Sequence, residues 1–316
     1  MHRRQILASA AAVMAASSAF AWPDQPVKLV VPFTPCTGPD IIARFVAERL
    51  KLGQPVVVEN VAGASGNIGS QQVARAKPDG HTLMSSVNTL VMNASLYSNL
   101  SYDPVADFIP LGLSAWGSLV LVAHPSQKPG TLAELIAAAK ASPKTLTYGS
   151  PGVGTPHHLS MALVETAAGI EMVHVPYKGT AGAVQDLLGG QIGTMFLPVH
   201  VSAQHIRAGK LKAIAAGSPQ RLPQLPDVPT LAESGLAGVD VDMWYGFFAP
   251  KDTPPELVDR LNKEISAILN SPEAKAAFEA QGLIPATSTP KALGEIVVRD
   301  KGRWADVVAK RGIKPE

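Results

Sequence analysis

The residues with the clearest potential for chemistry form a short loop of small and polar residues between a strand and a helix. The loop follows the apolar run 27–31 and leads into the helical pattern 40–52; it contains Phe33, Thr34, Pro35, Cys36, Thr37 and, at the helix start, Asp40. The first N–H groups of a helix have no partners within the helix, and the helix dipole adds about half a positive charge at that end. This segment is therefore predicted to bind an anion.

A second strand, loop and helix start of the same type lies far along the chain. Its strand ends near Tyr148, its loop contains Ser150 and Gly154, and its helix begins after Thr155. Two such helix starts that face each other would hold an anion from both sides.

A third loop, 174–180, connects the end of a strand to another helix. It carries Tyr177, Lys178 and Gly179. Ligands bind at strand C-termini in doubly wound sheets, so Tyr177 is expected to line a site with its ring and one hydroxyl. Lys178 has two interpretations, as a lining residue or as the partner of a surface acid.

Catalytic motifs are mostly absent. The nucleophile pattern G-x-S-x-G fails around Ser150 and around Ser65, and no H-E-x-x-H, Walker A or G-x-G-x-x-G pattern occurs. A hydrolase with Cys36 or Ser150 as nucleophile and His158 as base would need a third group to orient the base, and the sequence shows none. We therefore expect a protein that is not an enzyme and has no cofactor.

Several residues near these loops have a structural interpretation that we favour. Asp40 is expected to cap its helix rather than to pair with a ligand ammonium, because a carboxylate would repel an anion in this site. Cys36 is expected to be a small buried residue rather than a reactive thiol. His157 and His158 point about 100° apart on a helix, so one is expected to line the loop and the other to be exposed, without a shared metal.

Short β-rich runs alternate with helical runs along the whole chain, which is typical of an α/β protein with parallel sheets and crossover helices. Strands are expected at 27–31, 55–59, 82–86, 108–113, 119–123, 145–148, 171–175, 192–197, 211–216 and 246–249. Helices are expected at 40–52, 66–76, 131–142, 157–168, 180–189, 200–208, 230–234, 255–271, 272–281 and 290–311. The uncharged stretch 82–102 is interpreted as buried strands and loops.

The beginning of the chain resembles an export signal. Residues 1–21 combine a basic start, a short apolar run and a small-x-small cleavage pattern, and the run is shorter than the about 20 residues that span a membrane. The pair Arg3-Arg4 leaves both the Sec and the twin-arginine routes open. The remaining 295 residues (316 minus 21) hold 25 Lys and Arg, two fewer than the full 27, against 25 Asp and Glu. This balance does not favour a nucleic-acid partner, and the single cysteine excludes an intramolecular disulfide.

The length and the element pattern predict two domains and a hinge. A chain of this size usually divides its core. We expect the chain to cross between lobes near 119–123 and to return near 242–247. The expected division is 22–121 plus 246–316 for the first lobe and 122–245 for the second, with a cleft between them.

An ordered set of motifs identifies a family that the sequence resembles. The motifs are Leu29-Val30-Val31-Pro32-Phe33, Gly63…Gly66-Asn67-Ile68-Gly69, Pro78-Asp79-Gly80-His81-Thr82-Leu83, Tyr102-Asp103-Pro104, Tyr148-Gly149-Ser150, Pro176-Tyr177-Lys178-Gly179 and Leu225-Pro226-Asp227-Val228-Pro229-Thr230. From about residue 22 to 316 the chain resembles the Bug family, the TctC-like extracytoplasmic solute receptors of tripartite tricarboxylate transporters.

The resemblance implies a periplasmic binding protein of the Venus flytrap kind, with two doubly wound, Rossmann-like lobes of type II-like topology. It implies a small carboxylate ligand, aliphatic with two or three carboxylates or aromatic, held largely by backbone N–H groups and waters. It also implies a monomer that delivers its ligand to membrane subunits of the TctA and TctB type. The implied first-lobe site is Phe33, Thr34, Pro35, Cys36, Thr37 and Asp40, with Ser86 and Asn88; the implied second-lobe site is Ser150, Gly154, Thr155, His158, Tyr177, Lys178 and Gly179.

The sequence departs from the family pattern in two loops. Pro35-Cys36-Thr37 stands where the family usually has Pro-Gly-Gly, and Gly182 stands where a proline usually follows the Tyr-Lys-Gly turn. Side chains at the first position are expected to narrow or reshape that end of the site. A receptor that reports to a signalling partner remains an alternative to a transport receptor.

Overall fold

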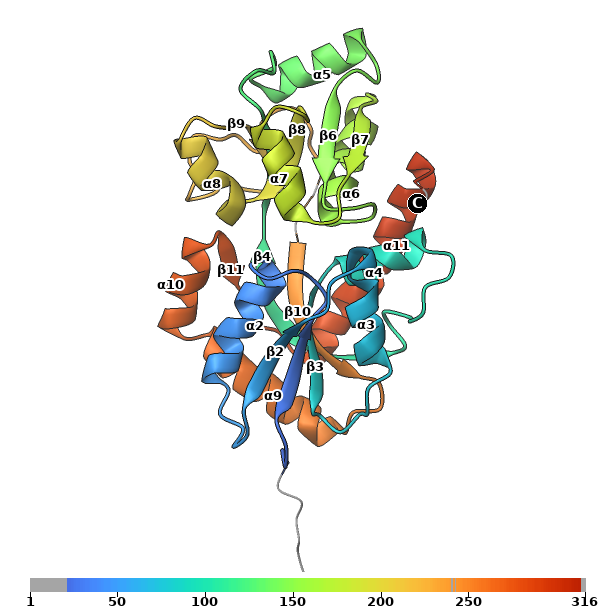
Figure 1. Cartoon of the computed structure of the whole chain (residues 1–316), viewed down its shortest axis with the longest axis vertical. Helices are drawn as coiled ribbons and strands as arrows, with labels where there is room; N and C mark the ends of the chain where they lie inside the picture. The colour runs from blue at the N-terminus through green and yellow to red at the C-terminus, as the bar shows by residue number, and fades with distance from the viewer. Residues whose placement is uncertain (1–21, 240, 242, 314–316) are drawn as a thin grey trace, which may run out of the picture.

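The computed structural model describes residues 22–239, 241 and 243–313, and it shows two lobes stacked along the long axis of the molecule (Figure 1). Each lobe is a β-sheet covered by α-helices, so the predicted α/β fold with two lobes is confirmed. The expected export signal, 1–21, lies outside the described residues. Among the residues that are described, no helix is both long and apolar enough to cross a bilayer.

The first lobe contains a six-stranded sheet with the order β11-β4-β10-β3-β1-β2. Its strands are β1 (Val27–Val31), β2 (Val56–Asn60), β3 (Thr82–Val87), β4 (Phe108–Gly117), β10 (Met243–Pro250) and β11 (Leu283–Pro285). Its helices are α2 (Gly38–Arg49), the 3-10 turn η1 (Ala64–Gly66), α3 (Asn67–Ala74), α4 (Thr89–Leu96), α9 (Pro255–Leu269), α10 (Pro272–Ala280) and α11 (Pro290–Arg311).

The second lobe contains a five-stranded sheet with the order β7-β6-β8-β5-β9. Its strands are β5 (Leu119–Ala123), β6 (Thr147–Ser150), β7 (Val173–Pro176), β8 (Thr194–Pro198) and β9 (Lys212–Ala216). Its helices are α5 (Leu132–Ala141), α6 (Pro156–Ala168), α7 (Thr180–Leu188) and α8 (Val199–Arg207).

The five strands of the second sheet repeat the order and directions of five of the six strands of the first, which adds β11 at one edge, and neither sheet is purely parallel. Strands β1, β2 and β3 run parallel, as do β6, β7 and β8, but β10 is antiparallel to both of its main neighbours, β3 and β4, and β5 is antiparallel to β8 and β9. The edge strand β11 is antiparallel to β4, so the expectation of parallel sheets is wrong for it as well as for the two crossing strands, β5 and β10. Each crossing strand is the one by which the chain enters a sheet from the other lobe, so its direction is opposite to that of the strands that follow a crossover helix.

The chain passes between the lobes where the sheets meet. Only Ser118 separates β4 in the first sheet from β5 in the second. The expected boundary at residue 121 falls inside β5, which pairs along its whole length within the second sheet. On the return, β10 of the first sheet begins at Met243, three residues before the expected boundary. The last helix, α11, packs on α4 and β4 and also contacts α6 of the second lobe.

Most of the helices have apolar residues at helical spacing. Helix α4 does not, and it was not predicted from the sequence. In α9, Val258, Leu261 and Ile265 form a buried stripe at helical spacing. Helix α4 lies inside the uncharged stretch interpreted as strands and loops, and it is buried along most of its length. A helix that is apolar on all sides has no periodic signal, so its sequence is ambiguous.

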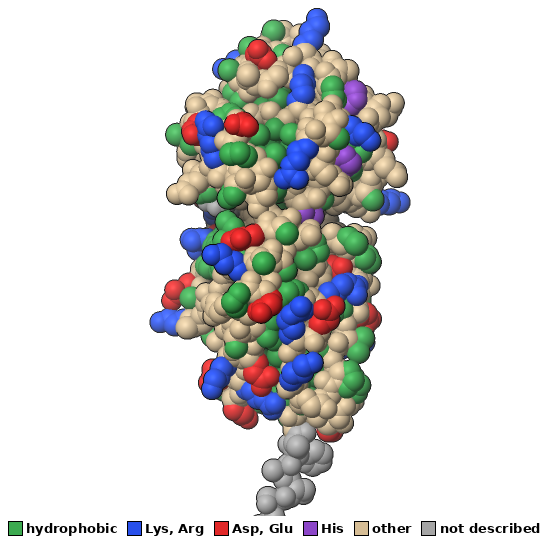
Figure 2. Space-filling view, turned by 90° about the vertical axis from the view of Figure 1, so that its left-hand side faces the viewer, with side chains coloured by type: hydrophobic (Ala, Val, Ile, Leu, Met, Phe, Trp, Pro, Cys, Tyr) green, Lys and Arg blue, Asp and Glu red, His purple; other side chains and the backbone are tan. Residues whose placement is uncertain are grey.

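Charges of both signs occur on the face of the molecule drawn in Figure 2. On the face drawn in Figure 2, Lys and Arg side chains alternate with Asp and Glu side chains over both lobes, and the molecule narrows between the lobes. This distribution agrees with the charge balance of the sequence and gives no basic stripe on this face for nucleic acid.

Candidate functional site

Six helices begin at the edges of the two sheets that face each other. In the first lobe β1 leads to α2, β2 to α3 and β3 to α4; in the second lobe β6 leads to α6, β7 to α7 and β8 to α8 (Figure 1). Each helix contributes a residue at or beside its first position to the walls of the interlobe cleft: Gly38, Gly66, Thr89, Pro156, Thr180 and Pro198. The cleft therefore collects the positive ends of six helix dipoles.

The cleft consists of two adjoining chambers. The hinge chamber has a volume of about 420 Å³ and reaches Met243 and Tyr245 of the crossing strand β10. The loop chamber has a volume of about 390 Å³ and lies between the first-lobe loop 62–66 and the second-lobe loop 177–180. Both volumes are in the range of about 300–1,000 Å³ that is usual for small-molecule sites.

Three threonines mark the junction of the chambers. Thr37 is the N-cap residue of α2, Thr155 is the N-cap residue of α6, and Thr180 is the first residue of α7. All three line both chambers. The junction thus brings three helix starts, from both lobes, to one place in the cleft.

Acidic side chains are nearly absent from these helix starts. The first turns of α3, α4, α6, α7 and α8 contain no acid. Only α2 carries one, Asp40, and its carboxylate is buried away from both chambers. The positive potential of five helix starts is therefore not neutralised from within their own first turns.

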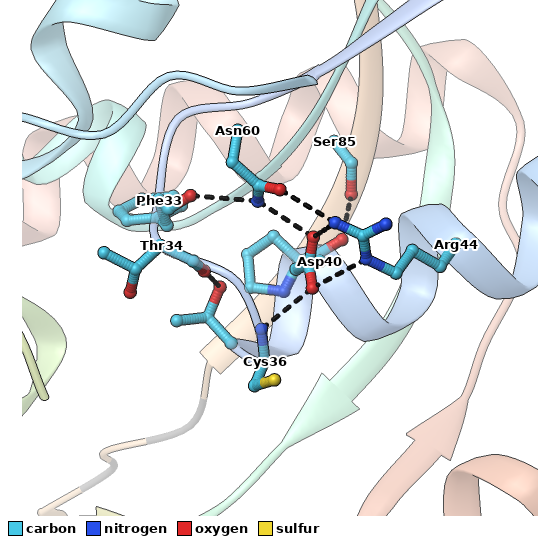
Figure 3. A network of polar contacts seen from close by, with 9 residues as sticks. Phe33, Thr34, Cys36, Asp40, Arg44, Asn60 and Ser85 are labelled. Atoms are coloured by element: carbon cyan, nitrogen blue, oxygen red, sulfur yellow. Dashed lines mark hydrogen bonds and ion pairs between the residues drawn. The ribbon is translucent and has the colours of Figure 1, made fainter. Parts of the chain in front are cut away.

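Asp40 is the centre of a network that holds the first loop (Figure 3). Its Oδ2 accepts hydrogen bonds from the Cys36 N–H at 2.8 Å and from Arg44 Nε at 3.0 Å, and its Oδ1 accepts one from Asn60 Nδ2 at 2.8 Å. Burial alone would raise the pKa of Asp40, but the hydrogen bonds from Arg44, Asn60 and the Cys36 N–H lower it below its ordinary value. Asp40 is thus ionised and supports the loop from behind.

The expected capping role of Asp40 is wrong in its detail. The N-cap residue of α2 is Thr37, whose side chain donates instead to the Thr34 carbonyl at 2.9 Å. Asp40 is the third residue of the helix and reaches back to the Cys36 N–H. Its partners Cys36 and Arg44 are each four residues away, but its third partner, Asn60, comes from the end of β2 and could not be predicted from the local sequence.

Cys36 is exposed and lines the hinge chamber, so the expectation of a buried cysteine is wrong. Its backbone has φ 65°, in the left-handed region that glycine adopts without cost. This conformation directs the thiol towards solvent instead of the core. A cysteine side chain therefore reduces the space at a turn whose backbone would suit glycine.

The second-lobe loop uses several of its own N–H groups. The Gly152 N–H donates to Ser150 Oγ, the Gly154 N–H donates to His158 Nδ1 at 3.1 Å, and the Thr155 N–H donates to the Gly152 carbonyl. In the first loop the Cys36 N–H is also engaged, and Pro39 and Pro156 have no N–H to offer. Fewer amides are free for an anion than the loop sequences suggested.

A stack of aromatic rings supports this loop. The rings of His158 and His174 lie parallel with centroids 3.9 Å apart, and the Tyr148 ring stacks with both, at 4.9 Å from His174 and 6.2 Å from His158. His174 Nε2 is 2.7 Å from Ser150 Oγ. Burial lowers the pKa of His174 to about 4, so the ring is neutral near pH 7. Ser150 is fully buried in this arrangement, and its hydroxyl donates to the Gly152 carbonyl at 2.9 Å.

Nine of the fifteen residues predicted for the site line the chambers, and six lie behind the walls. The lining residues are Phe33, Thr34, Pro35, Cys36, Thr37, Thr155, Tyr177, Lys178 and Gly179. Asp40, Ser86, Asn88, Ser150, Gly154 and His158 are buried and line neither chamber.

Tyr177 and Lys178 lie on the loop chamber. The Tyr177 hydroxyl donates to Asp186 Oδ2 at 2.6 Å, and burial together with Asp186 raises its pKa to about 12. The phenol therefore presents its ring, not its hydroxyl, to the chamber. Lys178 is exposed at the rim, which places one cation near the junction.

The hinge chamber has further lining residues that were not predicted for the site. His157, which follows the start of α6, lines it together with His200 of α8 and Tyr245 of β10. The expectation that one of the paired histidines would be exposed is wrong, since His158 is buried and His157 faces the chamber. These residues come from segments far apart in the sequence. Their only local signal was the position of His157 and His200 at helix starts.

Tyr245 is fixed in the hinge chamber by two glycines. A Cβ at Gly38 would lie 2.7 Å from the Tyr245 ring, and a Cβ at Gly117 would also lie 2.7 Å from it. Both glycines are needed for close approach of the ring. The phenol is buried between them, which raises its pKa.

The sequence matches a model of the tripartite tricarboxylate transporter family receptor over residues 42–313. A protein encoded in a tcbD-tcbE intergenic region of Pseudomonas sp. (strain P51) is 38% identical, with 98% of this chain and 94% of that protein covered. Protein BugT of Bordetella pertussis is 36% identical, with 98% and 96% covered.

Solved structures show the same fold. The periplasmic binding protein BugD has a TM-score of 0.85 and 36% identity, with 93% of this chain and all of that chain covered. A protein of R. palustris solved with adipate has a TM-score of 0.87 and 34% identity, with 93% and 100% covered. MatC from Rhodopseudomonas palustris with bound malate has a TM-score of 0.83 and 32% identity, with 91% and 100% covered.

Proposed function

The chain belongs to the tripartite tricarboxylate transporter receptor family, and from this membership we propose that it captures one small organic carboxylate between its lobes in the periplasm. The resemblance to the Bug proteins is confirmed by BugT and by the structure of BugD. The family consists of solute-binding receptors. The class of the ligand, its place in the cleft and its delivery to a transporter are our proposals.

One observation supports the carboxylate above all others. Six helices start at the cleft, five of them without an acid in the first turn, and the sixth has its Asp40 bonded to Arg44 behind the loop. An anion in the cleft thus gains from unneutralised helix dipoles and idle N–H groups. The same positive potential would repel a cation.

We place the carboxylate at the junction of the chambers, among Thr37, Thr155 and Thr180. The N–H groups at the start of α7 are its main donors there, because the Thr37 hydroxyl and the Thr155 hydroxyl and N–H already donate within their own loops. Hydrogen bonds to a charged group contribute about 1.5–3 kcal/mol each. Three or four of them would offset the costs of association and support binding in the micromolar range. Lys178 at the rim adds attraction at long range.

The ligands of the neighbours agree with this class. One R. palustris relative was solved with adipate, and MatC was solved with malate. For this chain we propose a monomer that passes its ligand to membrane subunits of the TctA and TctB type, with no catalytic step. A receptor that reports to a signalling partner is the alternative, and capture of the partner from detergent-solubilised membranes separates the two.

The test removes one N–H group from the junction without breaking a helix. Thr180 is the first residue of α7, where proline is tolerated because its ring fits the helix start. Thr180→Pro deletes the N–H, and Thr180→Val deletes only the hydroxyl. Calorimetry with a panel of carboxylates is expected to show a loss of about tenfold or more for Thr180→Pro and a smaller loss for Thr180→Val.

Circular dichroism checks that both variants retain α7. If the wild-type protein binds no carboxylate of the panel, the proposed function is wrong. If it binds one and Thr180→Pro binds it equally well, the carboxylate does not lie at the junction.

A further inference from the structure

The hinge chamber is lined by a polar side chain, His157, that has no hydrogen-bond partner among the described residues. Both ring nitrogens of His157 are buried and make no hydrogen bond within the described part of the chain. A buried polar group without a partner costs about 1–3 kcal/mol. His157 lines a chamber of about 420 Å³, and because both ring nitrogens are covered in this conformation, a turn of the imidazole about its side-chain torsions is needed to bring one of them to a ligand. A ligand group that reaches His157 would satisfy it.

The walls around His157 are apolar and contain rings. Valine side chains come from three elements, Val87, Val184 and Val201, and Met243 closes the hinge side. Flat rings are contributed by Phe33, Tyr245 and His200. Such a lining favours an apolar ligand body, and ring faces favour a flat one.

The hinge chamber has no fixed charge. None of the described residues that line it is Lys, Arg, Asp or Glu. Burial lowers the pKa of His157 to about 3, with His200 adding to the effect, and burial lowers the pKa of His200 to about 4. Both histidines are therefore neutral near pH 7, and a charged ligand group beside them would lack a counter-charge.

We infer that the preferred ligand is a ring-bearing monocarboxylate whose apolar body fills the hinge chamber and whose far end carries an uncharged hydroxyl that hydrogen-bonds to His157. This inference rests on the proposed function, since it takes the carboxylate to lie at the threonine junction. A neutral imidazole has one donor and one acceptor nitrogen. A hydroxyl can accept a hydrogen bond from the first or donate one to the second. His157 is then the residue that selects the ligand by its polar end.

A dicarboxylate is the rival occupant. The starts of α4 and α8 add positive potential to the hinge chamber, through Thr89 and Pro198, and one relative was solved with adipate. A second carboxylate would find no Lys or Arg among the described residues that line the hinge chamber. The two ligand classes make opposite predictions, so one set of titrations separates them.

The experiment titrates the full mature chain with 4-hydroxybenzoate, benzoate and adipate by calorimetry. Wild-type protein is expected to bind 4-hydroxybenzoate about tenfold more tightly than benzoate, because only the former satisfies His157. In His157→Leu the two ring acids are expected to bind about equally. His205→Leu, on the last turn of α8 and outside both chambers, serves as the matched control and should retain the wild-type difference.

His157→Leu is expected to fold, because it replaces an unpaired polar group by an apolar one. His157→Gln is a second variant, which keeps a donor and an acceptor at this position. Tighter binding of adipate than of 4-hydroxybenzoate by wild type, or an unchanged preference in His157→Leu, would overturn the inference and leave the proposed function standing. Binding of none of the three, nor of malate, would count against the proposed function itself.

Discussion

The hydroxyl of Ser65 in the first lobe donates a 3.0 Å hydrogen bond to the carbonyl of Val153 in the second lobe. Ser65 lies in a loop where four successive residues have positive φ, from Gly63 to Gly66. Asn93 of α4 holds the same loop, through a hydrogen bond from its Nδ2 to the Ser65 carbonyl at 3.0 Å. The two lobes therefore meet beside the loop chamber at a contact with a defined geometry.

Ser65→Ala is expected to weaken ligand binding about fivefold, because a neutral hydrogen bond contributes about 1 kcal/mol and this one forms only while the lobes are in contact. Calorimetry measures the affinity, and small-angle scattering measures the opening. Ser126→Ala, whose hydroxyl contacts His124 on the second lobe, is the control. Equal affinity in Ser65→Ala would show that the contact does not favour closure.

Asp40→Asn is expected to destabilise the protein by about 1.5–3 kcal/mol, because an amide cannot accept from Arg44, Asn60 and the Cys36 N–H together. Since the pKa of Asp40 is lowered in the folded protein, its contribution is present above the unfolded pKa of about 3.9 and is lost as pH falls through the lower folded value. Urea unfolding measures the change. Arg49→Ala, an exposed site on the same helix, should change stability by less than about 0.5 kcal/mol.

Gly38→Ala is expected to reduce both stability and affinity. The added Cβ would lie 2.7 Å from the Tyr245 ring and would push it into the hinge chamber. Overpacking of this kind costs about 1–3 kcal/mol. Gly302→Ala in α11, where a Cβ meets no atom within 4 Å, is the matched control and should be neutral or stabilising. Wild-type affinity in Gly38→Ala would show that Tyr245 does not limit the chamber.

Ligand binding is expected to slow the reaction of Cys36 with a thiol reagent. Cys36 is the single cysteine of the chain, is exposed and lines the hinge chamber. The rate of colour release from Ellman's reagent therefore reports on this site alone. Protection should increase with ligand concentration and reach half its maximum at the Kd from calorimetry. A rate that saturating ligand leaves unchanged would place the ligand away from this loop.

The stability of the free protein is expected to fall as pH decreases from about 6.5 to about 4. Burial lowers the pKa of His174 from 6.5 to about 4, so across this range the unfolded chain binds a proton that the folded chain does not. The folded state is then favoured above pH 6.5 and loses this advantage towards pH 4. Urea midpoints across the range measure the slope. His174→Gln should reduce that slope without abolishing it, because burial lowers the pKa of His157 and of His200 as well.

Much of the fold and the general location of the site could be predicted from sequence. The loops 33–37, 151–155 and 177–180 were marked by prolines, glycines and small residues after apolar runs, and these local signals do not depend on distant partners. Helix α4 could not be predicted, because Thr89–Leu96 carries no charge and so shows no amphipathic period. The antiparallel strands β5 and β10 could not be predicted either, since strand direction depends on how the chain returns between lobes.

The sequence by itself determined that helix starts follow strand ends at several points, and hence that an anion site was to be expected. Only the tertiary structure decided which of these ends meet and which of their N–H groups are free. It brought Asn60 to Asp40, stacked His158 on His174, and brought His157, His200 and Tyr245 into one chamber. The reason is physical: caps and turns form within a few residues, whereas a chamber is formed by side chains that become neighbours only after two sheets have folded and the lobes have met.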